Sequence, residues 1–144
     1  MFFYAVYAFL PNKKDIYFNE YQNLSEEERR GVVLYREKVE KAFPKKNTEV
    51  SLMLNYKCFL NQMVTINDTM KKDFPKLKNE NEYGTIFVNV KKNFKKNIKF
   101  ETSDGLKIKI LPKEKYDYIS VCYNKNFKEW YVEYYDYPYL NFNE

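Results

Sequence analysis

The chain has 144 residues but no histidine, only three glycines and only two cysteines. Without histidine, imidazole is absent both as an acid or base near neutral pH and as a metal ligand. Three glycines are too few to build the glycine-rich loop that cradles a phosphate group. Cys58 and Cys122 lie far apart in the chain and form no CxxC pair of the kind that binds zinc. We therefore expect no metal site and no cofactor.

The cysteines and the apolar segments also indicate the cellular compartment in which the protein is expected. We expect both thiols to be reduced and to serve as small apolar side chains of the core, as is usual in the cytoplasm. No run of about 18 apolar residues occurs, so we expect no membrane span. Residues 1–10 are apolar, but they carry no basic leader and run directly into Pro11. We predict a buried, central strand over these residues and a cytoplasmic protein.

Aromatic residues make up 19% of the chain and hydrophobic residues 44%. They supply enough apolar surface for a single folded domain over residues 1–144. The net charge is +5, and all but three of the 25 basic residues are lysines. A coding sequence rich in A and T produces the same excess of lysine, so the charge alone does not identify an anionic partner.

A helix start is encoded after residue 24. Ser25 can accept a hydrogen bond from the first turn and Glu28 can return one, which is the capping-box pattern, and three carboxylates lie at the positive end of the helix dipole. Pro44 ends the segment. We predict a helix over about residues 25–43.

Residues 49–74 fit two patterns. Val50, Leu52 and Leu54 alternate as in a strand, whereas a helical spacing of three and four holds over the whole stretch. We favour the helix, and the connection 44–47 then makes an antiparallel helical hairpin. The apolar stripe of this predicted helix comprises Leu52, Tyr56, Phe59, Met63, Ile66, Met70 and Phe74.

The remaining residues alternate as strands, over 86–90, 98–102, 106–110, 119–123 and 130–134. Ser103, Asp104 and Gly105 form a hairpin turn between the second and third of these strands, and the last two strands pair across residues 124–128. The predicted order is β-α-α-β-β-β-β-β. We expect a two-layer α+β domain, with a helical hairpin packed on a mostly antiparallel sheet of about six strands.

A basic segment is the first candidate site. Lys91, Lys92, Lys95 and Lys96 surround Phe94, so that cations could contact phosphates while the ring stacks on a base. The alternative, which we favour, is a solvated turn in a lysine-rich chain. No known nucleic-acid-binding motif accompanies the segment.

A tyrosine-rich terminus is the second candidate site. Tyr131, Tyr135, Tyr137 and Tyr139 are more rings than one helical layer covers, and tyrosine is enriched at binding hot spots. We expect some of these rings to form an exposed patch that contacts a partner. The alternative is that they fill the second face of the sheet.

Arg36 is a weaker candidate, as a ligand for an anion or phosphate group. It falls in the apolar sector of the first helix, and the favoured alternative is that it extends beside that sector and pairs with Glu40. A nucleophile would need lysine, tyrosine or a carboxylate as its base, and no spacing selects such a set. We therefore expect no catalytic residues.

These observations favour a small, non-catalytic, cytoplasmic binding protein that occludes a macromolecular partner. Examples of this class are a phage-encoded inhibitor of host defence, of the anti-CRISPR type, and a toxin immunity protein. The expected partner is a protein, alone or within a nucleoprotein complex, and not a membrane. One alternative is a nucleic-acid-binding protein that uses residues 91–99. Another is a histidine-free ribonuclease or toxin.

Overall fold

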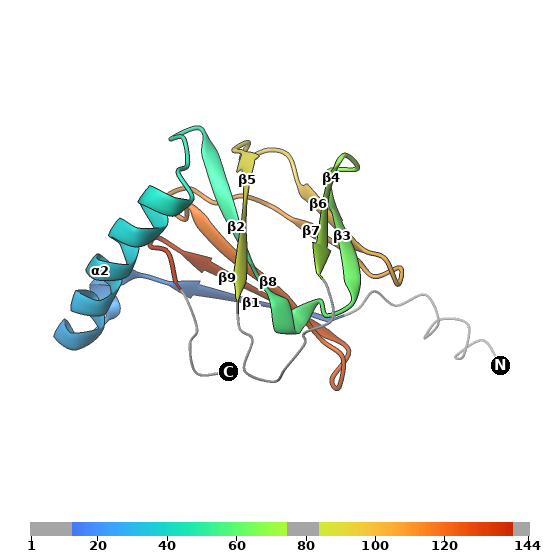
Figure 1. The fold of residues 1–144 in the computed structure, drawn as a ribbon, viewed down its shortest axis with the longest axis horizontal. Helices are drawn as coiled ribbons and strands as arrows, with labels where there is room; N and C mark the ends of the chain where they lie inside the picture. The colour runs from blue at the N-terminus through green and yellow to red at the C-terminus, as the bar shows by residue number, and fades with distance from the viewer. Residues whose placement is uncertain (1–12, 75–83, 140–144) are drawn as a thin grey trace.

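The computed structural model describes residues 13–74 and 84–139 (Figure 1). These residues form nine strands, one α-helix and two short 3-10 helices. In chain order the elements are β1 (Lys13–Asn19), η1 (Tyr21–Asn23), α2 (Glu26–Ala42), β2 (Glu49–Asn55), η2 (Tyr56–Cys58), β3 (Gln62–Ile66), β4 (Met70–Phe74), β5 (Thr85–Lys91), β6 (Ile98–Thr102), β7 (Lys107–Ile110), β8 (Tyr118–Asn124) and β9 (Glu129–Tyr135).

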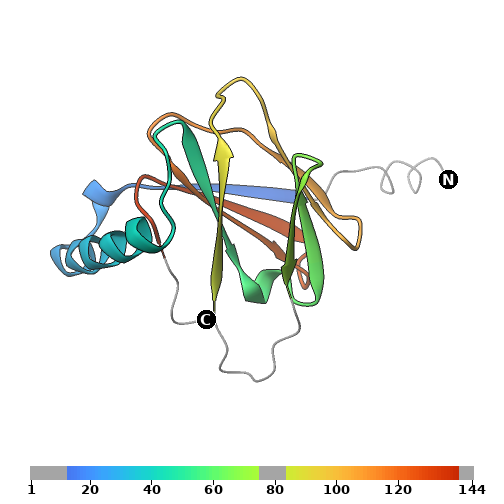
Figure 2. The ribbon, with the colours of Figure 1, turned by 45° about the horizontal axis from the view of Figure 1, so that its top comes forward.

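The strands form two sheets that face each other (Figures 1 and 2). The five-stranded sheet has the order β1-β9-β8-β2-β5, and the four-stranded sheet has the order β4-β3-β6-β7. The four-stranded sheet is antiparallel throughout. In the five-stranded sheet β1 runs parallel to β9 and β2 runs parallel to β8, while the other two pairs are antiparallel.

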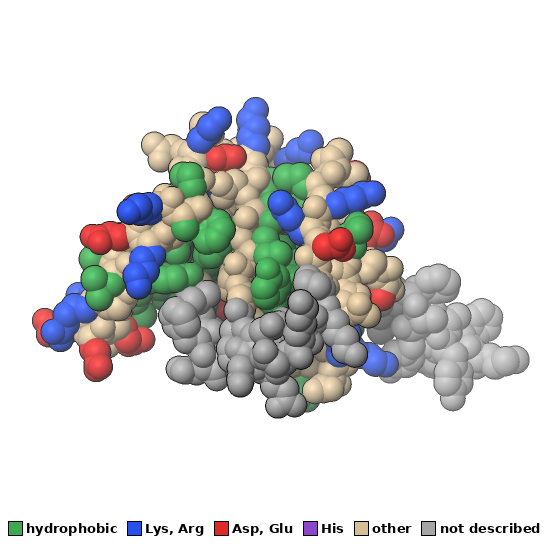
Figure 3. All heavy atoms as spheres, in the orientation of Figure 1, with side chains coloured by type: hydrophobic (Ala, Val, Ile, Leu, Met, Phe, Trp, Pro, Cys, Tyr) green, Lys and Arg blue, Asp and Glu red, His purple; other side chains and the backbone are tan. Residues whose placement is uncertain are grey.

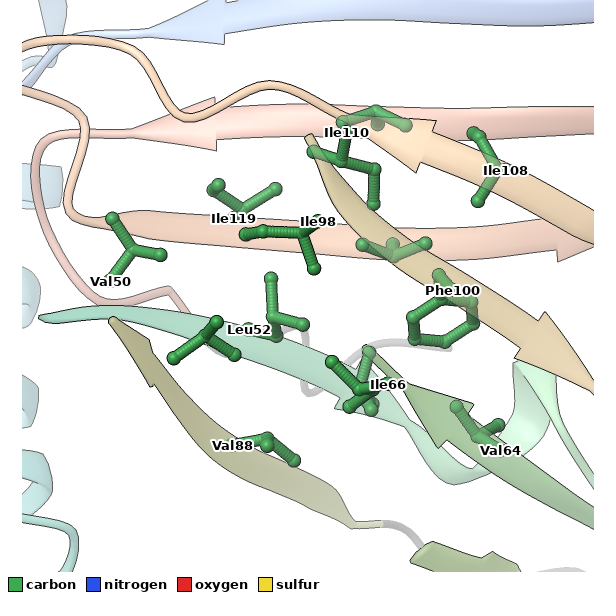
Figure 4. Packing of buried hydrophobic residues seen from close by; sticks show 14 of the residues in the cluster. Val50, Leu52, Val64, Ile66, Val88, Ile98, Phe100, Ile108, Ile110 and Ile119 are labelled. Carbon is green, nitrogen blue, oxygen red and sulfur yellow. The ribbon is translucent and has the colours of Figure 1, made fainter. Parts of the chain in front are cut away.

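The main core lies between the two sheets (Figure 4). Alternate residues of β2, including Leu52, point into it, and Ile119 of β8 does the same from the neighbouring strand. Ile66 and Phe100 enter from the four-stranded sheet, so both sheets bury one apolar face. This is the arrangement by which alternating strands remove apolar surface from water.

A second, smaller core lies on the opposite face of the five-stranded sheet, where α2 packs (Figure 1). Val39 of the helix meets Met53 of β2, Tyr118 of β8 and two tyrosines near the end of the chain. The predicted start of this helix is confirmed, since Ser25 and Glu28 form the capping box. α2 therefore adds a third, partial layer at one end of the sheet.

The expected helical hairpin on one sheet of about six strands is wrong. The structure is mostly strand, with one α-helix in the described ranges and two packed sheets. The error originates in residues 49–74, which form β2, η2, β3 and β4 in place of a helix. The strands expected in the second half of the chain are confirmed, including the antiparallel β6–β7 and β8–β9 pairs. The strand expected over residues 1–10 lies outside the described residues.

Turn residues explain why 49–74 does not form a helix. Asn61, Asn67 and Asp68 adopt positive φ angles of 60°, 52° and 64°, a conformation that asparagine and aspartate tolerate better than most residues. Asn67 and Asp68 turn the chain from β3 into β4, as such a pair does in tight hairpins. The helical spacing is therefore coincidental, and it places in the core a residue, Met63, that is 37% exposed on β3.

Cys58 and Cys122 form a disulfide, which corrects the expectation of two reduced thiols. β2 ends at Asn55 and η2 brings Cys58 over β8, with 5.3 Å between the two Cα atoms. In the described part of the chain, no helix combines the length and apolar character needed to cross a bilayer.

Candidate functional site

A hollow in the described surface lies on the outer face of the five-stranded sheet. It has a volume of about 630 Å³ and is open to solvent. The hollow is lined by side chains from β2, β8 and β9 and from the chain around η2. Met53 belongs both to this lining and to the cluster under α2, so the hollow begins where the helical layer ends.

Strand alternation places the lining. Residues of β2 and β8 that point away from the main core face this side, so Asn55, Ser120 and Asn124 present amides and a hydroxyl to the hollow. Tyr131 and Glu133 of β9, the next strand, also point to this side and present a phenol ring and a carboxylate to the hollow. Among the described residues the lining comprises Met53, Asn55, Lys57, Cys58, Leu60, Thr85, Ser120, Cys122, Tyr123, Asn124, Lys125, Asn126, Tyr131, Glu133 and Tyr139.

The disulfide fixes one wall of the hollow. Both of its cysteines are among the lining residues, and it ties η2 to β8. Turns next to the hollow are held by amides, because the Asn55 side chain accepts a hydrogen bond from the Lys57 N–H and the Asn124 side chain accepts bonds from two N–H groups of its turn. The shape of the hollow is therefore set by covalent and hydrogen-bonded contacts before any partner binds.

Two of the four candidate tyrosines lie at the hollow. Tyr139 is 40% exposed, stacks on Tyr135 at 5.1 Å between ring centroids, and its N–H donates to the Met53 sulfur. The Tyr131 hydroxyl donates to Glu129, and this bond, with a smaller effect of burial, raises the pKa of the phenol. Tyr131 and Tyr139 thus offer ring surface from fixed positions.

The other two tyrosines are not exposed, contrary to expectation. Tyr135 and Tyr137 are 4% and 3% exposed and belong to the cluster under α2. The Tyr135 hydroxyl donates to Glu133 at 2.8 Å, and burial is the main cause that raises its pKa. Burial also raises the pKa of Tyr137 to about 12. α2 covers the half of this face that carries Tyr135 and Tyr137, so those two rings fill the core and only Tyr131 and Tyr139 remain as candidates for partner contact.

The basic segment lies in the turn between β5 and β6, at the end of the molecule where lysines gather (Figure 3). Lys91, Lys95 and Lys96 are exposed, and the Phe94 ring is 40% exposed. Lys92 is different, since its ammonium group pairs with Asp117 at 2.8 Å. Four of the five candidates therefore lie together on an accessible turn, whereas the fifth, Lys92, forms an ion pair that stabilises the fold.

Arg36 lies on the half-buried side of α2, next to Tyr21. Its guanidinium carbon is 5.5 Å from the centre of the Tyr21 ring, and that of Arg29 is 5.7 Å from the same ring. The Tyr21 N–H donates to Asp136. Arg36 therefore contributes a cation–π contact between α2 and η1, which sequence patterns did not predict.

Among the described carboxylates, Glu20 has a strongly lowered pKa, and the sequence did not single it out. It accepts hydrogen bonds from Lys115 at 2.6 Å and from the Tyr116 hydroxyl at 2.7 Å. These bonds, in that order, lower the pKa of Glu20 to about 2. A carboxylate with such a pKa is a poor proton acceptor at neutral pH, so this cluster fits a structural role.

No group of three acidic or cysteine side chains able to hold a metal ion occurs within residues 13–74 and 84–139. The chain matches no protein-family model, and neither a curated protein nor a solved structure matches it.

Proposed function

We propose that this chain is a non-catalytic binding protein that docks a protein partner in the hollow on the outer face of the five-stranded sheet. The observation that carries the proposal is an open hollow of about 630 Å³ with tyrosine rings beside amide and hydroxyl groups. Rigid aromatic side chains concentrate binding energy because they bring large area at small entropic cost. The neighbouring polar groups supply orientation through hydrogen bonds.

The partner surface follows from the lining. Tyr131 and Tyr139 offer ring faces and edges, so an apolar or aromatic side chain of the partner would pack against them. Asn55, Ser120 and Asn124 would bond to backbone groups of the partner. The sequence favoured a protein that acts by occluding its partner. Occlusion requires only this contact, so it remains part of the proposal.

The disulfide supports a compartment other than the cytoplasm. Disulfides persist in oxidising surroundings, and thioredoxin and glutathione reduce them in the cytosol. We therefore place the protein and its partner in an oxidising compartment or at a cell surface. An immunity protein or another inhibitor of an exported protein fits that setting, whereas an anti-CRISPR protein would act among reducing thiols.

Affinity capture from the source organism tests the proposal, with full-length chain immobilised in buffer without reductant. The wild type and Phe94→Ser should retain the same protein partner, because Phe94 is as exposed as Tyr139 but lies away from the hollow. The double variant Tyr131→Ser/Tyr139→Ser should lose at least about nine-tenths of that partner. Equal capture by all three proteins, with unchanged circular dichroism, would refute the proposal.

A second candidate function, binding of single-stranded nucleic acid, is favoured by one observation. Phe94 is exposed within a turn that also exposes Lys91, Lys95 and Lys96. A ring for stacking beside cations for phosphates is the minimum that such binding requires. Loss of capture in the Phe94→Ser variant, together with co-purifying nucleic acid, would replace the first proposal by this one.

A further inference from the structure

β1 is the outermost strand of the five-stranded sheet, and among the described residues its only neighbour is β9. The C=O of Asn19, at its end, accepts a hydrogen bond from the Asp136 N–H on the β9 side. Because backbone groups of successive residues point to opposite sides of a strand, those of Tyr17 and Asp15 also face β9. The N–H and C=O groups of Lys14, Ile16 and Phe18 therefore face the open edge.

The second half of this edge strand is apolar. Ile16, Tyr17 and Phe18 are 44%, 49% and 52% exposed. They are therefore three consecutive exposed hydrophobic residues on a strand that has a neighbour on one side only among the described residues. Natural edge strands are usually protected by charge, proline or a bulge. β1 carries charge only in its first half, at Lys13, Lys14 and Asp15, and the residues from Ile16 to Phe18 carry neither charge nor proline. The Phe18 ring is held in place by stacking on Tyr134 at 5.0 Å, so this surface is preorganised.

We propose that β1 pairs with β1 of a second copy of the chain, antiparallel and about a two-fold axis through Ile16. The two five-stranded sheets would then join into one continuous sheet. This register follows from the backbone. With the axis at Ile16, Ile16 pairs with its own equivalent and Lys14 of each copy pairs with Phe18 of the other. All of these residues direct their backbone groups to the shared edge, so the three pairs exchange about six hydrogen bonds. No other antiparallel two-fold arrangement pairs all three residues in this way.

The side chains agree with this register. Ile16 meets its own equivalent, and each Lys14 lies beside the Phe18 ring of the other copy. On the opposite face Asp15 lies beside Tyr17, and no like charges are directly opposed. Asp15 is further neutralised within its own copy, where Lys13 lies 3.9 Å from it and 3.3 Å from Glu129. A register centred on Asp15 would place two carboxylates face to face and is disfavoured.

Charge substitution at the two-fold axis tests the proposal on the full-length chain. Sedimentation velocity over a concentration series should show a dimer for the wild type and for Leu34→Lys, which alters an exposed position on α2. Ile16→Lys and Ile16→Glu should each weaken dimerisation by at least about tenfold, because like charges then face each other. An equimolar mixture of these two variants should restore the dimer.

Each other outcome overturns the proposal. A wild type that stays monomeric at every concentration shows that a different segment or another protein covers β1. A dimer that survives both Ile16 variants lies on another surface. Failure of the mixture to recover the dimer, when both variants keep the circular dichroism spectrum of the wild type, rejects the register through Ile16. None of these results bears on the hollow, whose test is capture of a different protein.

Discussion

Lys92 Nζ lies 2.8 Å from Asp117 Oδ1, and Lys45 Nζ lies 3.1 Å from the second oxygen of the same carboxylate. Burial raises the pKa of Asp117, but the hydrogen bonds from Lys92 and then Lys45 outweigh it and hold that pKa below its usual range. The contact joins the connection before β2 and the turn after β5 to the start of β8. One of the lysines that suggested nucleic-acid binding therefore stabilises the fold.

Lysine-to-glutamine changes should separate these two roles. Replacing Lys95 and Lys96 should leave unfolding unchanged, and if the turn binds nucleic acid, each lost phosphate contact should reduce the salt slope of binding by roughly one. Lys92→Gln should instead lower the free energy of unfolding, by about 1 kcal/mol or less. Gel shifts with single-stranded RNA and urea unfolding measure the two effects. No shift of the wild type at low salt would end the nucleic-acid hypothesis.

Glu20 should contribute to acid unfolding. Its pKa falls from 4.5 to about 2 in the folded chain, with the Lys115 hydrogen bond as the largest cause. Its stabilising contribution is therefore complete above pH 4.5 and is lost as the pH falls through about 2. Glu20→Gln and Lys115→Gln should both flatten the decline of unfolding free energy across this range, measured by denaturant titration at several pH values. A decline as steep as that of the wild type in both variants would contradict this assignment.

The disulfide should account for a large part of the stability. Cys58 and Cys122 are separated by 64 residues, and closing a loop of that length stabilises a fold by about 4 kcal/mol in the chain-entropy model. Cys58→Ser/Cys122→Ser should lower the free energy of unfolding by a comparable amount. Denaturant titration checks this change, and alkylation with mass spectrometry checks the bond. Two alkylated thiols in native protein purified without reductant would show that the bond does not form.

Residues 59–63 distinguish the observed strands from the predicted helix. Phe59 is buried and touches Phe74 and Phe100, each at 5.4 Å between ring centroids, so Phe59→Ala should cost roughly 3 to 5 kcal/mol. Asn61→Ala, expected to be silent on a helix, should now cost about 1 kcal/mol because of the positive φ at this position. Asn61→Gly serves as the control and should be nearly neutral, whereas an equal loss in both Asn61 variants would exclude a backbone cause.

Substitution of Tyr135 and Tyr137 should act on folding. If these two rings formed an exposed patch, Tyr135→Ser/Tyr137→Ser would abolish binding and leave the melting temperature unchanged. Since both rings are buried under α2, each large-to-small change should cost roughly 3 kcal/mol or more. Thermal unfolding followed by circular dichroism should show a markedly lower melting temperature for the double variant Tyr135→Ser/Tyr137→Ser. The melting temperature of Tyr139→Ser should fall only slightly. A native melting temperature for the double variant would mean that α2 does not cover these rings.

Local signals were sufficient for several elements. Ser25 and Glu28 lie three residues apart, which is all that a capping box requires, so the helix start was predictable. The turn at Gly105, with its φ of 93°, and the alternation of apolar residues around it predicted the β6–β7 hairpin. The hollow was only half predictable. Tyr131 and Tyr139 stood out, but the amides of the lining come from β2, from β8 and from the turn after β8, which are distant in sequence.

Local sequence was enough for the α2 start and the later hairpins, because each depends on residues close together in the chain. Composition was enough to predict a large aromatic core. Tertiary structure decided the rest. Residues 49–74 satisfy both periods, and only pairing of β2 with β5 and β8, distant in sequence, selects the strand. The same pairing brings Cys58 to Cys122 and lets α2 bury Tyr135 and Tyr137 while Tyr139 stays exposed. Contacts between segments distant in sequence cannot be recognised in a short stretch of the chain, because they stabilise the fold only after both segments have come together.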